Sequence, residues 1–94
     1  MSPSQQHYHN ALELMLSNSL TRVLLWRFIV EDCQVFMESF PMNASAYCLL
    51  AKQEIGKRLL ADAKAVSVEM VHLAEKEYAA LMELNEQHKQ QGDE

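Results

Sequence analysis

The stretch that decides the fold runs from Leu20 to Phe40 and reads LTRVLLWRFIVEDCQVFMESF. Thirteen of its 21 residues are apolar, they include the only Trp and all three Phe, and the stretch has neither Gly nor Pro. Its apolar residues recur at steps of three and four, which predicts an amphipathic helix. Leu24, Leu25 and Phe28 widen the apolar face beyond the ~100° of an ordinary surface helix, so we expect cover on more than one side.

The rest of the chain favours an all-α fold in one domain, residues 1–94. Two Gly and two Pro in 94 residues leave few places for turns, and good helix formers dominate. Pro41 should end the central helix near Ser39, and the short loop then predicts an antiparallel hairpin of helices 20–39 and 44–66. A chain of this size buries only roughly 60–65% of its unfolded surface, so we expect oligomerisation to complete the fold.

Two further helices flank the predicted hairpin. A short one should run from about Gln5 to Leu16, started by the capping sequence Ser2-Pro3-Ser4. Ser17-Asn18-Ser19 then indicates a turn in preference to a kink. The C-terminal helix should span 67–88, and the sequence leaves open whether the helix from Ala44 breaks near Ser67.

The C-terminal helix carries a second apolar stripe with heptad spacing, formed by Val71, Ala74, Tyr78, Leu81 and Asn85. Residues 1–4 and 89–94 are expected to be flexible ends. From the two stripes we take the following candidates for core or interface positions: Trp26, Ile29, Val30, Cys33, Phe36, Met37, Phe40, Val71, Tyr78 and Leu81.

Gly56 lies inside the second helix of the hairpin, where Gly costs roughly 0.5–1 kcal/mol relative to Ala. It is either a point of close helix approach beside Trp26 or Phe28, or a tolerated accident. Cys33 and Cys48 flank the predicted hairpin turn, and one interpretation is that they face each other across the two helices and form a disulfide or a redox switch. Buried Cys acting as a small apolar side chain is far commoner.

The formal charge of −5 comes entirely from residues 61–94, which hold eight acidic and three basic groups. A chain without a basic patch is a poor candidate for direct nucleic-acid binding. The acidity is most simply a solvated helix face that keeps the protein soluble. A sharper alternative is an acidic helical inhibitor that occupies the basic groove of a host protein acting on nucleic acid.

No motif indicates an enzyme, a cofactor or a metal centre. Glu69 and His72 have the Glu-x-x-His spacing of di-iron bundles, but that site needs two such motifs and two more Glu. No Ser or Cys has a matched His and acid, and no Gly-rich phosphate loop is present. We therefore expect function through protein–protein interaction.

The sequence also indicates the cellular compartment. The first ten residues lack the basic region of a secretory leader, and Arg27 interrupts the longest apolar run far below the ~18–20 residues of a membrane span. Two Cys are no disulfide framework, which favours a reducing cytosol.

Several segments resemble the Bbp-nineteen-like family of small tailed-phage domains. The resemblance spans roughly Leu20 to Glu77 and is carried by TRVLLW at 21–26, VF at 35–36, Phe40, NAS at 43–45 and QEIGKRLLAD at 53–62. The chain departs from the family pattern at Thr21, where Gly is usual.

This resemblance implies a short bacteriophage protein from the structural and packaging module, with no established enzymatic activity. Its partners would be further copies of itself or other virion proteins, such as portal, tail or internal proteins. The role would be assembly of the virion, of the head–tail junction or of the ejection apparatus. The protein would occupy the host cytoplasm during assembly and could be carried in the virion.

Overall fold

A computed structural model of the chain describes residues 1–37 and 44–92, and over these residues it is all-helical, as the sequence predicts. The elements in chain order are α1 (Pro3–Ser17), α2 (Ser19–Arg27), the wider helical turn η1 (Phe28–Asp32), α3 (Ala44–Val66) and α4 (Val68–Gly92). No strand occurs in the described part of the chain. No described helix is long and apolar enough to cross a membrane.

The start of α1 follows from its first residues. The Ser2 hydroxyl accepts a hydrogen bond from the Gln5 amide at 3.2 Å, and the Gln5 side chain accepts one from the Ser2 amide at 2.9 Å. This reciprocal capping box satisfies amides that have no partner inside the helix, and Pro3 supplies the fixed φ of a first turn. The predicted helix start is therefore confirmed, two residues earlier than expected.

The predicted turn between the first two helices is also confirmed. Asn18 has an extended backbone, with φ −121° and ψ 131°, and its Oδ1 accepts a hydrogen bond from the Leu20 amide at 2.9 Å. The Thr21 hydroxyl donates to the Met15 carbonyl at 2.6 Å, which satisfies an end group of α1. Asn18 thus ends α1 and begins α2.

The prediction of one central helix over 20–39 is wrong. Regular helix ends at Arg27, η1 continues to Asp32, and Gln34 has a positive φ of 54°. The Gln53 side-chain amide, from α3, donates hydrogen bonds to the carbonyls of Gln34 at 2.9 Å and Met37 at 3.0 Å. These bonds satisfy backbone groups that a continued helix would have paired internally, so the chain can leave the helix here.

The break near Ser67, left open by the sequence, is present. Ser67 separates α3 from α4, and its hydroxyl accepts a hydrogen bond from the Met70 amide at 3.2 Å, which caps α4. α4 continues to Gly92, beyond the predicted end at residue 88. The predicted pairing of two long helices in an antiparallel hairpin, and its completion by oligomerisation, stay predictions.

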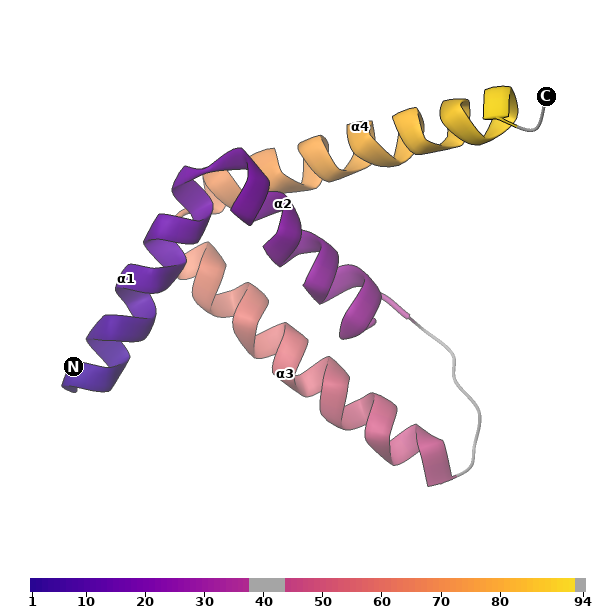
Figure 1. Cartoon of the computed structure of the whole chain (residues 1–94). Coiled ribbons are helices and arrows are strands. Elements are labelled where there is room, and N and C mark those ends of the chain that lie inside the picture. The colour runs from indigo at the N-terminus through magenta and orange to yellow at the C-terminus, as the bar shows by residue number, and fades with distance from the viewer. Residues whose placement is uncertain (38–43, 93–94) are drawn as a thin grey trace.

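The helices meet at one place, which we call the hub (Figure 1). There α2 lies against α1 and the first half of α4, and η1 and α1 lie against α3. The hub consists of Leu12, Leu16, Leu25, Trp26, Ile29, Ala63, Val71 and Ala74, each at most 8% exposed. Small Ala63 and Ala74 let the helices approach closely around the large side chains.

Away from the hub the molecule is open. Its extents are 55 × 38 × 17 Å and its radius of gyration is 15.7 Å. A compact domain of this length has a radius of gyration of about 12 Å. In Figure 1 the distal half of α4, drawn in yellow, extends away from the other helices. Among the described residues, eight of the ten buried apolar side chains belong to the hub, and the other two are Cys33 and Ala46.

Candidate functional site

The ten residues predicted for core or interface divide between the interior and the surface. Those that are buried are Trp26, Ile29, Cys33 and Val71, and those that are partly buried are Val30 and Tyr78. Those that are exposed are Phe36, Met37 and Leu81, at 57%, 43% and 50%. Phe40 lies outside the described residues. Of the nine candidates that the structure describes, six are therefore at least partly buried and three are exposed.

Part of the exposed apolar surface lines a cavity of about 400 Å³, which lies where α1 meets α2 and η1. We call this cavity the apolar groove. Six apolar side chains form most of its wall: Leu12, Met15, Leu24, Leu25, Phe28 and Leu59. Leu24 is 56% exposed and Phe28 is 40% exposed. The expectation that Leu24, Leu25 and Phe28 need cover on a second side identified this wall, although the sequence did not show that α1 supplies its other side.

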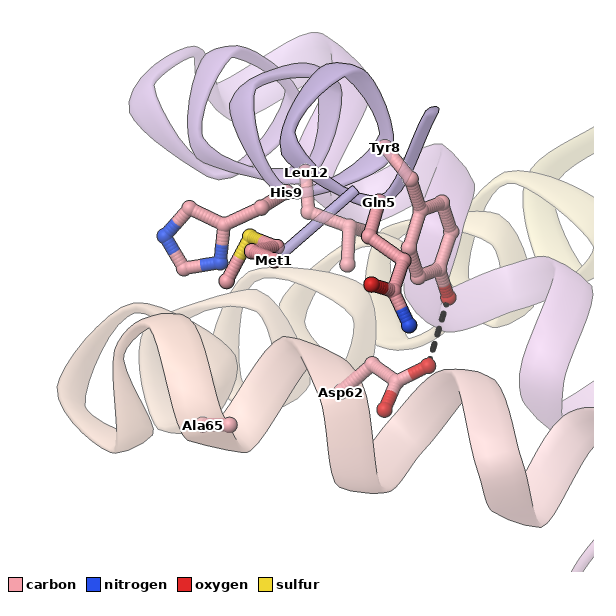
Figure 2. Close-up of a pocket in the computed structure, with 7 residues that line it drawn as sticks. All are labelled: Met1, Gln5, Tyr8, His9, Leu12, Asp62 and Ala65. Atoms are coloured by element: carbon pink, nitrogen blue, oxygen red, sulfur yellow. Dashed lines mark hydrogen bonds between the residues drawn. The ribbon is translucent and has the colours of Figure 1, made fainter. Parts of the chain in front are cut away.

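A hydrogen bond at the edge of the groove holds α1 against α3. The Tyr8 hydroxyl donates to Oδ2 of Asp62 at 2.9 Å (Figure 2). Burial, and then this bond to a carboxylate, raise the pKa of Tyr8 to about 12, so its hydroxyl keeps its proton at pH values where an ordinary tyrosine ionises. The sequence analysis missed this contact, because 54 residues separate its two partners.

A second cavity, of about 490 Å³, lies on the other side of Tyr8 between α1 and α3. Figure 2 shows Gln5, His9 and Asp62 around it, with Tyr8 bonded to Asp62. Four of its seven lining residues are polar, namely Gln5, Tyr8, His9 and Asp62. The hydrogen bond drawn among them is the one that joins the two helices. This cavity lies in the angle between the two crossing helices.

A third cavity, of about 320 Å³, lies between α2–η1 and α4, and Val23, Leu81 and Met82 are among its walls. At its base the Tyr78 hydroxyl donates to Oε2 of Glu31 at 2.7 Å, and Arg27 Nε lies 3.5 Å from the same oxygen. The bond to Glu31, and then burial, raise the pKa of Tyr78. This network links α2 and η1 to α4.

A bidentate ion pair that the sequence analysis also missed anchors α2 to α4. Arg22 Nε and Nη2 bond the two carboxylate oxygens of Glu77 at 2.5 and 3.0 Å, and Nη1 donates to the Leu16 carbonyl at 3.3 Å. The Arg22 side chain is only 12% exposed. A sequence signal existed, because Glu77 is an acid placed beside the apolar stripe of its helix, but spacing alone names no partner.

The other candidates for chemistry are the Glu69–His72 motif and the two thiols. Glu69 and His72 are exposed, and His72 Nδ1 lies 3.4 Å from Glu75 Oε2. Within residues 1–37 and 44–92, no group of three His, Cys, Asp or Glu side chains could hold a metal ion. Both thiols are free, with Cys33 buried and Cys48 exposed, and burial is the main cause that raises the pKa of Cys33.

Gly56 is a point of close approach, as one of the two predictions held, but its neighbours are not Trp26 or Phe28. A Cβ atom placed on Gly56 would overlap Cγ2 of Val35 and lie 2.5 Å from Cβ of Cys33. α3 therefore needs Gly where the residues that follow η1 cross it.

No family model, characterised protein or solved structure matches this chain. The exposed apolar surface is therefore the feature from which function has to be inferred.

Proposed function

We propose that this chain is a small helical interaction protein of a bacteriophage structural module, acting in assembly of the virion, the head–tail junction or the ejection apparatus. The resemblance of residues 20–77 to small tailed-phage domains supports the phage setting. The apolar groove supports the mode of action. The protein would work in the host cytoplasm during assembly, and be retained in the particle if its partner is a virion component.

The observation that carries the proposal is the exposure of Leu24 and Phe28 in a groove whose floor is already built of apolar side chains. Fully burying one such side chain stabilises a complex by roughly 1.5–3 kcal/mol. The wall residues belong to elements that the hub holds in place, so little ordering would oppose binding. An amphipathic helix with apolar anchors at steps of three and four suits a groove of this kind.

The oligomeric hairpin expected from the sequence belongs to the same proposal. η1 already lies against α3, and further copies would cover apolar side chains that lie outside the groove. Ile55 of α3, at 60% exposed, and Leu84 of α4, at 62% exposed, are examples. Self-association and binding of another virion protein can then use different faces of one chain.

The test is mass spectrometry of purified particles of the phage that encodes the chain, with crosslinking to identify its neighbour. Leu24→Asp places a charge in the groove at a side chain exposed enough to leave the fold intact, and we expect it to abolish incorporation. Leu20→Asp is the matched control, because Leu20 is on the same helix, is 81% exposed and does not line the groove. Normal incorporation of Leu24→Asp would contradict the proposal.

One observation favours the alternative of an acidic inhibitor of a host protein. Glu75, Glu83 and Glu86 are all exposed on α4, and at 100° per residue they lie on one side of it. For an inhibitor, reversing all three to Lys should abolish binding to the host protein. For an assembly protein that uses the apolar groove, the same variant should be incorporated normally.

A further inference from the structure

The chain exposes more surface than a folded monomer of its mass should. Its solvent-accessible surface is 7034 Å², whereas a compact monomer of 10.8 kDa exposes about 5,500 Å². The excess of roughly 1,500 Å² per chain equals what each copy buries in a permanent homodimer, where both copies together lose about 2,000–5,000 Å². A second copy is therefore an occupant of the right size.

The distal half of α4 is exposed along its length. From Glu83 to Gln90 every side chain is exposed, and Leu81 and Leu84 are 50% and 62% exposed. An isolated helix shorter than about 12–15 residues is marginal in water. Leu81 and Asn85 border the cavity that α4 shares with α2 and η1. Beyond this cavity, Figure 1 shows α4 with no other helix beside it. A helix of this kind gains stability when another surface covers its apolar side.

The exposed side chains continue a seam that the chain itself uses nearer the hub. Val71 and Ala74 are buried at the hub. The same spacing of three and four leads through Tyr78 to Leu81, Asn85 and His88, with Leu84 alongside. Glu83 and Glu86 lie on the opposite side of the helix, about 150° from this seam at 100° per residue. An acidic chain can therefore meet its own copy along the seam without opposing carboxylates.

We propose that a second copy of this chain covers the distal half of α4, with the two α4 helices pairing along Leu81, Leu84, Asn85 and His88. With Val71 and Tyr78 at the first position of a heptad, Asn85 takes that position too. One polar residue there restricts register and favours two helices over larger bundles. The inference rests on the premise of the proposed function, that exposed apolar surface in this chain is an interface. It places the self-association face on α4, away from the apolar groove.

Sedimentation of the full chain across the micromolar range tests the inference. We expect the wild type to be a dimer, and Leu84→Glu to weaken the dimer by at least about tenfold, which corresponds to about 1.4 kcal/mol. Ala79→Glu is the matched control, because Ala79 is exposed on the opposite side of α4. It should sediment as the wild type does. Circular dichroism should give Leu84→Glu a helical spectrum, since its side chain is exposed in the single copy.

A second variant tests the same seam by strengthening the association and not by weakening it. Asn85→Leu removes the polar seam residue and should give assemblies larger than a dimer, or a tighter one. A wild type that stays monomeric throughout, or loss of the dimer in Ala79→Glu to the same degree as in Leu84→Glu, would overturn the inference. Leu24→Asp separates the two proposals: it should stay dimeric while failing to enter particles, and a dimer that Leu24→Asp dissolves would place self-association in the groove instead.

Discussion

The two halves of α4 carry the same apolar spacing and have opposite surroundings. Val71 and Ala74 are 5% and 2% exposed, whereas Leu81 and Leu84 are 50% and 62% exposed. The difference arises from the neighbour, since the nine residues of α2 span about 14 Å and the 25 residues of α4 about 38 Å. Periodicity therefore specifies which side of a helix is apolar, while the length of the neighbouring element decides how much of that side is covered.

The largest expected effect is at Trp26, in the enclosed region. Trp26→Ala should cost about 3–5 kcal/mol of unfolding free energy, because the side chain is 8% exposed and its loss leaves a cavity at the hub. That is a large share of the stability of so small a domain. Thermal melting followed by circular dichroism measures it. A shift in Tm of only a degree or two would break the comparison, because the hub would then be no better packed than the distal half of α4.

The ion pair between Arg22 and Glu77 lies at the boundary between the two regions. Glu77→Gln should cost about 2 kcal/mol, since it leaves a mostly buried guanidinium without its counter-charge. Glu75→Gln, two residues away and exposed, should change the unfolding free energy by less than about 0.5 kcal/mol. Urea unfolding of both variants gives the comparison. Equal effects would show that Glu77 behaves as an ordinary surface acid.

The sequence was sufficient for the features that local chemistry controls. The all-α class, the capped start of α1 at Ser2 and the turn at Asn18 follow from side chains that bond their own neighbours. The interior positions Trp26, Ile29 and Val71 follow from apolar spacing. Each of these features depends on contacts within one helix or on one side of it.

Features that depend on a residue far away in the sequence could not be predicted from the sequence. The central helix ends early because Gln53 bonds the carbonyls of Gln34 and Met37, and no spacing rule pairs a glutamine with a turn 16 to 19 residues earlier. The apolar groove needs α1 folded against α2, a consequence of the angle at Asn18. The pairing of Tyr8 with Asp62 needs the crossing of α1 and α3. Tertiary geometry decides all three.

Gly56 tests how tightly α3 is held to the residues that follow η1. Gly56→Ala should lower the unfolding free energy by about 1–2 kcal/mol, because overlap with Val35 and Cys33 outweighs the roughly 0.5–1 kcal/mol that Ala gains in a helix. Val35→Ala should partly restore stability in the double variant, since it removes the closest atom. A higher Tm for Gly56→Ala alone would contradict this, because it would show that Val35 and Cys33 move aside at little cost.

The smallest effect, and the one most specific to a single contact, concerns the bond between Tyr8 and Asp62. Tyr8→Phe removes one hydrogen bond at a partly exposed site, so at neutral pH it should cost about 0.5–1.5 kcal/mol at most. The pKa of Tyr8 is raised from 10.0 to about 12 in the folded chain. The folded state therefore holds the phenolic proton more tightly than the unfolded state does, and this contribution to stability is complete below pH 10.

Above that pH the contribution declines, and it is lost as the pH rises through about 12. The wild type should consequently lose stability between pH 10 and pH 12 by more than Tyr8→Phe does. Tyr78→Phe is the informative companion, because the pKa of Tyr78 is raised mainly by its bond to Glu31 on the other side of the hub. If Tyr8→Phe and wild type lose stability in parallel over this range, the contact between α1 and α3 does not persist in solution, and the apolar groove loses the bond that holds its outer wall.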